Sequence, residues 1–516
     1  MDAGVEEQNV DVAIIGGGPT GLFTGLLLSR LGVSVCVLDA KPKSLDLGRA
    51  DALNARTQQY LEIANLLEPL LSQGIKCNTS STFGDGEFKS RQNKWWIGLE
   101  HALHKNFLML GQPVVEELFS SELKTSVHYG EQVSSVRELE DAVEIATTSG
   151  RRVRSRFAIG ADGARSMVRR EMGVSFTGTK PEMLWAVLDT FIDTDFPVCP
   201  EIITFELNGQ SRVSWIPRER GLCRFYVLID GEVTQERAQE SIKQHMAPYN
   251  IEFTKTEWFS TFEVKERVAS SFVSRGGEGR LILAGDAAHV HSVNGGQGLN
   301  TGISDAFSLA WRLATILNNH NLKPEACDKI IRSYDIERRG TAQNVVDVAA
   351  ALVRDTIRKA KQYVGTIEKN AGYITGMGVS YESFKSPLIW ASERGIWKAG
   401  HRCPDVILRN VGGKNTRLYT EAIYGNYIIL LIGNHRTVAN NHGDITKTYR
   451  VRPALTNSTE GKTLNSGECA YEADWVSDED SFVVVVRPDM YIGYVGENVD
   501  DCSSYLDELY CRTSTR

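Results

Sequence analysis

The sequence contains no C-x-x-C motif, although it has nine cysteines among its 516 residues. Their number is odd and their spacing irregular, which argues against a disulfide framework, a zinc ribbon and a thioredoxin-type redox pair. Reduced thiols in a reducing compartment are the simpler interpretation. Proline is also scarce, with 14 residues, and the 46 glycines follow no repeat. This composition excludes the collagen-like and proline-rich disordered classes.

Long hydrophobic runs and an excess of basic residues are absent as well. Apolar stretches such as 427–432 are far too short to span a bilayer, and the acidic N-terminal segment lacks the apolar region of a signal peptide. We therefore expect a cytoplasmic protein with no membrane span. The formal net charge is −8, with 57 Lys and Arg against 65 Asp and Glu. Because nucleic-acid binding favours a basic face, we expect no nucleic-acid partner.

The chain is long enough for about three domains. Residues 10–15, 19–30 and 33–38 predict strand, helix and strand, the βαβ unit that opens a parallel sheet. Residues 181–264 alternate in polarity between turn signals, which predicts an antiparallel sheet. The pattern is helical for nearly 90 residues after Gly302 and returns to short strands near Gly395.

The predicted fold is α/β, with a Rossmann-like nucleotide-binding domain interleaved with a β-rich domain. The predicted boundaries are 1–180 for the first part of the nucleotide-binding domain, with a short insertion near 73–96, and 181–264 for the β-rich domain. Residues 265–394 then form the second part and the long helices, and 395–516 form a separate α/β domain.

A dinucleotide fingerprint occupies the predicted βαβ unit: Gly16, Gly18 and Gly21 stand at its turn, and Asp39 ends its second strand. Gly16 allows the tight turn, Gly18 lets a pyrophosphate approach the backbone, and Gly21 lets the helix lie close to the sheet. The N-terminus of the helix favours the phosphates, and Asp39 can bind ribose hydroxyls. The alternative is a βαβ unit whose glycines serve packing only. The fingerprint alone does not separate FAD from NAD.

Two later segments favour FAD. Residues 156–174 resemble the Asp-Gly motif, and residues 280–314 the Gly-Asp motif, of flavoprotein hydroxylases. The chain is thus similar to the single-component FAD-dependent aromatic hydroxylases of the para-hydroxybenzoate hydroxylase superfamily, and within it to the phenol hydroxylase branch, which has many fungal members. The resemblance implies that the Rossmann-like domain binds FAD, that the insertion near 73–96 lies on the substrate side, that 181–264 form the substrate domain, and that the protein is fungal. Residues 400–408 and the strands that follow resemble the thioredoxin-like C-terminal domain of that branch, and the missing C-x-x-C agrees with a structural role for it.

The resemblance implies a set of FAD contacts. An arginine after the βαβ unit faces the pyrophosphate in the family, and Asp286 can accept hydrogen bonds from ribityl hydroxyls. The glycine-rich loop that enters the helix after residue 295 favours the negative charge of reduced flavin, because backbone N–H groups and the helix dipole point there. The implied FAD-binding residues outside the fingerprint are Arg49, Gln112, Asp162, Asp286, Gly296, Gly298, Leu299 and Asn300.

The resemblance also implies three catalytic residues, Asp51, Arg218 and Tyr226. The oxygen that a flavin C4a-hydroperoxide delivers is electrophilic, so the ring must be electron-rich. A phenol has a pKa near 10, and its phenolate is far more nucleophilic than the neutral form. Asp51 would take the hydroxyl proton, while Arg218 and Tyr226 orient the substrate and stabilise the oxyanion. Arg224 shares the strand parity of Tyr226 and is a competing cation.

The sequence therefore predicts a monooxygenase that uses FAD, NADPH or NADH, and O2 to hydroxylate a small aromatic substrate, in secondary metabolism or aromatic degradation. Because no second fingerprint occurs, the nicotinamide must bind transiently, and Arg165, Arg169 and Arg170 are candidates for its phosphates. A homodimer is a further expectation. The H-x-H pair His289 and His291 lacks further ligands, so we expect no metal.

Two other functions remain open. One is a monooxygenase that acts on an indole or another ring, by epoxidation or dearomatisation. The other is a flavin oxidase or dehydrogenase. Val293 stands where the family often has a proline beside the substrate. Trp95 and Trp96 could cover an aromatic binding pocket or pack in the hydrophobic core.

Overall fold

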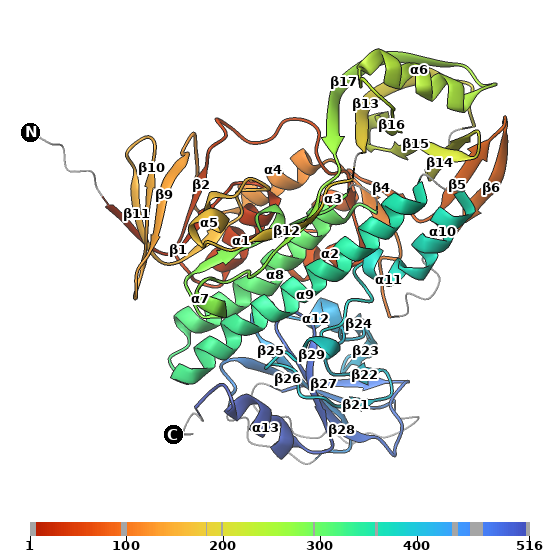
Figure 1. Cartoon of the computed structure of the whole chain (residues 1–516). Coiled ribbons are helices and arrows are strands. Elements are labelled where there is room, and N and C mark those ends of the chain that lie inside the picture. Colours follow the sequence, from red (N-terminus) through yellow and green to blue (C-terminus); the bar gives the residue numbers. More distant parts are fainter. Residues whose placement is uncertain are drawn as a thin grey trace, which may run out of the picture.

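The computed structural model describes residues 7–93, 101–181, 183–197, 200–292, 295–356, 360–435, 442–454 and 468–511. Trp95, Trp96 and Val293 lie outside these ranges. The described chain forms an α/β fold built on three large sheets, which confirms the predicted fold class (Figure 1). No helix in the described ranges is long and apolar enough to serve as a membrane span.

The first sheet is the parallel one that the βαβ unit predicts. Its parallel strands lie in the order β8-β2-β1-β11-β19, and β10 and β9 extend it as antiparallel strands. Helix α1 (Pro19–Arg30) connects β1 to β2. The strands are β1 (Glu7–Ile15), β2 (Val35–Asp39), β8 (Val127–Tyr129), β9 (Val133–Glu138), β10 (Val143–Thr147), β11 (Arg152–Gly160) and β19 (Leu281–Leu283).

The second sheet contains the β-rich middle of the chain. Its order is β17-β13-β16-β15-β14-β5-β6, so strands from residues 80–93 join those of 184–263. Helix α6 (Gln235–Met246) packs on it, at the top right of Figure 1. The strands are β5 (Ser80–Gly84), β6 (Glu87–Asn93), β13 (Leu184–Thr194), β14 (Ile202–Leu207), β15 (Gln210–Pro217), β16 (Cys223–Leu228) and β17 (Ile251–Glu263).

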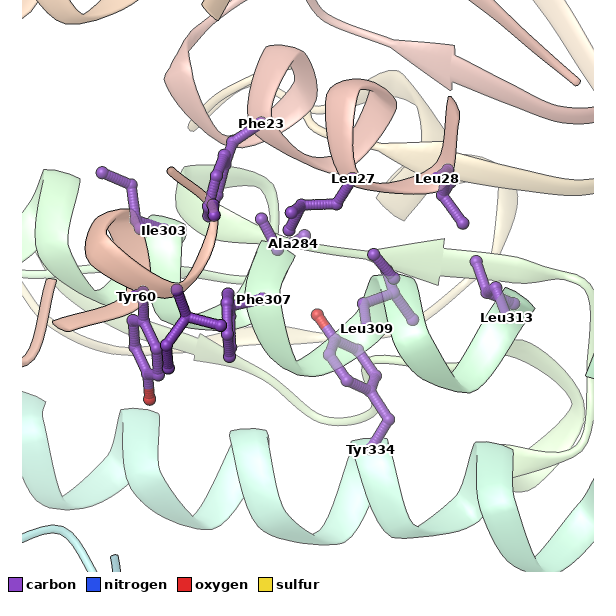
Figure 2. Packing of buried hydrophobic residues seen from close by; sticks show 14 of the residues in the cluster. Phe23, Leu27, Leu28, Tyr60, Ala284, Ile303, Phe307, Leu309, Leu313 and Tyr334 are labelled. Atoms are coloured by element: carbon purple, nitrogen blue, oxygen red, sulfur yellow. The ribbon is translucent and has the colours of Figure 1, made fainter. Parts of the chain in front are cut away.

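Helices α8 (Gln297–Asn318) and α9 (Pro324–Thr356) run together between the first sheet and the C-terminal part of the chain (Figure 1). Helix α1 packs against α8, and Figure 2 shows Phe23 and Leu27 directed at the α8 side chains. The Phe307 ring of α8 stacks on Tyr60 of α2 (Ala55–Ile63), with ring centroids 4.3 Å apart. The contact between α1 and α8 holds α8 against the βαβ unit. The fingerprint motif and the Gly-Asp motif, which were both expected to bind FAD, therefore lie in one packed core.

The C-terminal part contains the third sheet, of order β24-β23-β27-β26-β25-β28-β29, and helix α13 (Val499–Asp507). Strands β25, β26 and β27 are mutually parallel and the remaining pairs are antiparallel. Its thioredoxin-like character stays a prediction. The strands are β23 (Ile407–Asn410), β24 (Asn415–Arg417), β25 (Tyr427–Gly433), β26 (Thr446–Pro453), β27 (Glu468–Ala473), β28 (Ser481–Val486) and β29 (Ile492–Gly496).

Short elements join these layers around the glycine-rich loops. Two small sheets have the orders β3-β7-β4 and β12-β18-β20. Their strands are β3 (Ala52–Leu53), β4 (Ile75–Cys77), β7 (Phe107–Met109), β12 (Phe176–Thr179), β18 (Glu266–Ala269) and β20 (His289–Val290). In the chain, helix α4 (Gln112–Glu122) follows β7 and helix α5 (Met167–Glu171) precedes β12.

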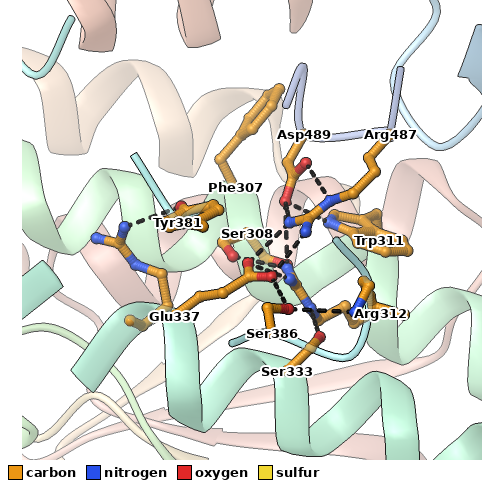
Figure 3. A network of polar contacts seen from close by, with 12 residues as sticks. Phe307, Ser308, Trp311, Arg312, Ser333, Glu337, Tyr381, Ser386, Arg487 and Asp489 are labelled. Atoms are coloured by element: carbon orange, nitrogen blue, oxygen red, sulfur yellow. Dashed lines mark hydrogen bonds and ion pairs between the residues drawn. The ribbon is translucent and has the colours of Figure 1, made fainter. Parts of the chain in front are cut away.

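A buried ionic network joins the third sheet to α8 and α9 (Figure 3). Arg487 donates to both carboxylate oxygens of Glu337, at 2.7 and 2.8 Å, and Arg312 donates to one of them at 2.7 Å. Asp489 accepts from Arg487 at 2.6 Å and from Arg312 at 3.3 Å. Burial disfavours the charge on Asp489, but the two guanidinium groups outweigh it and hold the pKa of that carboxyl below its usual range.

Candidate active site

A cavity of about 750 Å³ opens where the second sheet meets the start of α8. Residues of the 45–52 loop, of the middle sheet and of the segment 286–299 line it. Such a volume is in the range of ligand-binding cavities. Six of the predicted FAD contacts and two of the predicted catalytic residues line this one space. The FAD contacts are Arg49, Gln112, Asp286, Gly296, Gly298 and Leu299, and the catalytic residues are Asp51 and Tyr226.

The three fingerprint glycines meet different surroundings. A Cβ atom at Gly16 would lie 2.1 Å from the Ala161 carbonyl oxygen, and one at Gly21 would lie 1.9 Å from the Gly16 carbonyl oxygen. Both positions therefore require glycine for packing. A Cβ atom at Gly18 would meet nothing within 4 Å, so packing does not explain this glycine, and a pyrophosphate that approaches the backbone does.

We expect Gly18→Ala to weaken FAD binding by at least about 10-fold without loss of stability. Its backbone is extended, with φ −84° and ψ −178°, which alanine adopts freely. The added methyl group would occupy the space that the phosphates need. Titration of apoprotein by flavin fluorescence gives the affinity, and thermal unfolding gives the stability. Unchanged FAD affinity would favour the packing-only interpretation, while Gly21→Ala should disrupt the fold whichever interpretation holds.

Asp39 ends β2 beside the fingerprint turn and is buried. Its carboxylate accepts hydrogen bonds from the backbone N–H of Gly17 at 2.5 Å and of Lys41 at 2.7 Å. These bonds hold the acid at the end of its strand, where ribose hydroxyls can reach the remaining lone pairs. Asp162 likewise accepts from the Met167 N–H at 2.7 Å, while its second oxygen is buried without a partner.

Arg49 and Asp286 face the cavity from opposite segments. The Arg49 guanidinium is exposed to it and makes no ion pair with any residue that the structure describes, which fits a bidentate contact with phosphate. Asp286 lies on the cavity wall and is exposed to that space. The surrounding protein raises the pKa of this carboxyl, while His289 and Arg49 act against the rise. Gln112 accepts from the Ala50 N–H at 3.2 Å and so supports the loop that carries Arg49.

The start of α8 forms the end wall of the cavity. Gly296 precedes the helix with a left-handed φ of 63°, and Gly298 and Leu299 line the cavity. The first N–H groups of a helix have no partner within it, and the positive end of the dipole lies here. Asn300 is buried, and its amide donates to Ala52 O at 2.9 Å. Its side chain therefore joins α8 to the 49–54 segment. These features fit the isoalloxazine and ribityl parts of FAD.

Asp51 is buried beside Tyr226, although 175 positions separate them in the chain. The Tyr226 hydroxyl donates to Asp51 Oδ2 at 3.4 Å, and Arg224 Nη1 lies 3.5 Å from the same oxygen. Burial and the charge of Asp51 raise the pKa of Tyr226, so this phenol stays neutral. The group thus offers a hydrogen-bond donor and a carboxylate side by side.

Arg224, rather than Arg218, supplies the guanidinium in this group. Arg224 is fully buried and donates twice to Asp189, at 2.6 Å each, and its Nη1 also donates to the carbonyl of Arg49. Arg218 donates to Glu219 from Nε and Nη2, at 2.8 Å each, while its Nη1 lies 3.6 Å from Asp189. It lines a neighbouring cavity of about 460 Å³. The structure therefore does not bring Arg218 to Tyr226.

The turn between β15 and β16 explains this placement. Ser214 pairs with Tyr226, and Ile216 with Arg224, so Arg224 and Tyr226 share one face of β16. Arg218 stands outside β15, at the entry to the 3₁₀ turn Glu219–Gly221, where alternation no longer determines the direction of its side chain. The parity of Arg224 with Tyr226 is therefore the sequence signal that points to the observed pair.

Sequence reasoning missed two residues of this site, Asp189 and Trp258. Asp189 is a buried acid in the middle of β13, a position where an unpaired charge would be costly. Trp258 lines the cavity beneath Gly48, where a Cβ atom would lie 2.4 Å from the indole. The only signal for either residue is a polar or aromatic side chain in a strand, which is too common to be decisive.

The arginines proposed for the nicotinamide differ in exposure. Arg165 lines the cavity, and both Arg165 and Arg170 are exposed. Arg169 is buried, donates to Ala287 O at 2.7 Å, and lies 3.8 Å from the centre of the Phe176 ring. Arg169 therefore supports the Gly-Asp turn from behind and does not face solvent.

Among the described residues, no group of three His, Cys, Asp or Glu side chains is placed to hold a metal ion.

The parallel sheet, the fingerprint and the cavity together define a dinucleotide-binding protein with a Rossmann-type core. The chain belongs to the FAD binding domain family, whose model matches residues 9–349. This result confirms FAD as the cofactor and the resemblance to FAD-dependent aromatic hydroxylases. The predicted fungal origin stays untested.

Two relatives and one solved structure illustrate the similarity. "FAD-dependent monooxygenase ankC" of Aspergillus thermomutatus is 28% identical over 378 residues, which are 66% of this chain and 62% of that protein. "3-hydroxybenzoate 4-monooxygenase" of Comamonas testosteroni is 26% identical over 425 residues, 72% of this chain and 66% of that protein. The anhydrotetracycline hydroxylase OxyS of Streptomyces rimosus has the same fold, with 23% identity, a TM-score of 0.75, and 98% and 100% of the two chains covered. The chain spans 53–66% of the length of the first four relatives it matches.

Proposed function

We propose that this chain is an FAD-dependent monooxygenase that uses NADPH or NADH and O2 to hydroxylate a phenolic or other electron-rich aromatic substrate. One observation carries the proposal: the Asp51–Tyr226–Arg224 group opens to the same cavity as Arg49 and Asp286. A proton acceptor and the cofactor-facing residues therefore border one space. Relatives named "Phenol 2-monooxygenase fsqG" and "3-hydroxybenzoate 4-monooxygenase" support the same substrate class.

The role proposed for each residue follows from the chemistry of its side chain. FAD would be held by the fingerprint glycines, Arg49 and the start of α8, and with electrons from a nicotinamide it would supply the chemistry that activates O2 for insertion of one oxygen atom into the ring. Asp51 accepts the proton of the substrate hydroxyl, which converts a weakly nucleophilic phenol into a phenolate. The neutral Tyr226 hydroxyl donates a hydrogen bond to the oxygen that becomes negative. Arg224, held by Asp189, orients both residues and balances the added charge.

Three finer points belong to this proposal. The proposed role is in secondary metabolism or aromatic degradation, and the relative named "3-hydroxybenzoate 4-monooxygenase" supports an aromatic substrate. Arg165 lines the cavity, Arg170 is exposed, and both suit the phosphates of a transient nicotinamide. The proposal also includes that the protein forms a homodimer and is located in the cytoplasm.

The test is to measure NADPH and NADH oxidation by the purified holoenzyme with a panel of phenols, resorcinols and indoles. We expect a phenolic compound to accelerate oxidation and to give a product that is heavier by one oxygen atom, which ¹⁸O2 labels. If only indoles accelerate it, the alternative ring chemistry applies. A flavin-loaded protein that no aromatic compound accelerates, and that transfers electrons without inserting oxygen, would instead be an oxidase or dehydrogenase.

A further inference from the structure

His291 directs an unpaired nitrogen toward the cavity. It follows β20, is only 8% exposed, and belongs to the cavity wall. Its Nδ1 lies 3.1 Å from the carbonyl oxygen of Ser292. Because a carbonyl oxygen only accepts, the hydrogen of a neutral ring is on Nδ1 and Nε2 is an acceptor. This tautomer leaves one lone pair for a ligand.

The ring stays neutral in this environment. Burial, together with the nearby His289, lowers the pKa of His291 to about 4, against smaller opposite effects of Ser292 and Asp305. His291 itself makes no ion pair with any acid in the described ranges, because Asp305 is engaged by His289 at 2.8 Å and by Arg338 at 2.7 Å. His291 therefore offers a hydrogen-bond acceptor and no charge.

The position of the ring is fixed. It lies parallel to His289, with centroids 6.2 Å apart and planes 6° from each other. Its Cε1 atom is 3.9 Å from where a Cβ atom of Gly298 would stand, at the start of α8. Nε2 makes no hydrogen bond to the described residues, and it is not among the side-chain atoms sealed in the core without a partner. It therefore borders the open space of the cavity.

We propose that His291 is a further binding residue of this cavity, whose Nε2 accepts a hydrogen bond from an N–H or O–H group of the bound FAD or of the aromatic substrate. The substrate alternative rests on the proposed function, whereas the FAD alternative rests only on the family. Either donor would satisfy a buried acceptor that the protein leaves unpaired.

The test compares three variants of the holoenzyme. His291→Phe keeps the ring shape and removes the acceptor, and His291→Gln restores an acceptor oxygen. His245→Phe is the matched control, because His245 is also buried with Nδ1 bonded to a backbone carbonyl, Ser241 O at 2.7 Å, while its Nε2 is sealed in the core. Flavin fluorescence measures FAD affinity, and the change in flavin absorption on adding a phenol measures substrate affinity. Circular dichroism and thermal unfolding establish that each variant is folded.

We expect His291→Phe to weaken one of the two affinities by about 5–10-fold, the size of one lost hydrogen bond, and His291→Gln to recover most of it. A change in FAD affinity alone identifies the cofactor as the donor, and a change in phenol affinity alone identifies the substrate. The proposal is overturned if a folded His291→Phe changes neither affinity, if His245→Phe changes them equally, or if His291→Gln restores nothing. Wild-type protein that no aromatic accelerates would refute the proposed function, yet the FAD measurement would still test His291.

Discussion

Replacing Asp51 with asparagine will lower the rate of ring hydroxylation by about 10²–10⁴-fold, the usual contribution of a positioned acid or base, while FAD remains bound. Asparagine preserves the size of the side chain and can still accept from the Tyr226 hydroxyl, which lies 3.4 Å away. It cannot take the proton of the substrate hydroxyl. The measurement is product formation under single-turnover conditions, with FAD content read from the visible spectrum.

Glu263→Gln is the matched control for this experiment. Glu263 also lines the cavity, but it is exposed and pairs with Lys265 at 3.0 Å and Lys180 at 3.4 Å. The same change from carboxylate to amide should therefore leave hydroxylation nearly unaffected. Equal losses in the two variants would mean that the overall charge of the cavity matters rather than proton transfer to Asp51. Normal hydroxylation by Asp51→Asn would refute the assignment of Asp51 as the base.

Glu337→Gln will destabilise the protein by about 3–5 kcal/mol, the typical cost of removing one partner from a buried ion pair. Glu337 is fully buried and neutralises both Arg312 and Arg487 (Figure 3). Its amide would leave the two guanidinium groups with Asp489 as their only carboxylate among the described residues. Chemical denaturation, followed by circular dichroism and flavin fluorescence, gives the change in the free energy of unfolding.

The control for this prediction lies on the same helix. Glu325 is exposed in the first turn of α9, so Glu325→Gln should change stability by less than about 0.5 kcal/mol. A Glu337→Gln variant that unfolds at the wild-type midpoint would contradict the buried network. Because the chain has several domains, flavin release and loss of secondary structure should be compared before a single free energy is assigned.

The network also explains why the C-terminal part bears on the cofactor site. Arg338 of α9 donates to Asp305 at 2.7 Å and to the Tyr381 hydroxyl at 3.2 Å. Asp305 in turn accepts from the Gly285 N–H at 2.9 Å, next to Asp286. The Gly-Asp turn is thus held from behind by buried polar contacts that extend through α9 toward the third sheet. Loss of the contacts between α9 and the third sheet should therefore weaken FAD binding and also lower the free energy of unfolding.

Local sequence patterns predicted the structural features of this protein that depend on residues close together in the chain. The glycines at 16, 18 and 21 specify a turn between strand and helix whatever the rest of the chain does, and Asp39 follows at the end of the next strand. The Gly-Asp segment likewise predicts a loop that enters a helix, which α8 provides. Period-two alternation in the middle of the chain predicted the second sheet. Each of these signals is confined to a stretch of at most a few tens of residues.

The sequence by itself determined the class of fold and the FAD cofactor, and it predicted Asp51 as the acid of the site. Only the tertiary structure decided that Arg224 lies beside Asp51, that Arg218 pairs with Glu219, and that Glu337 neutralises arginines from two separate segments. The physical reason is that a motif encodes local backbone geometry, whereas an ion pair depends on which distant strands and helices pack together. Asp51 and Arg224 come within 3.5 Å only because β16 of the second sheet packs against the loop that follows the first βαβ unit.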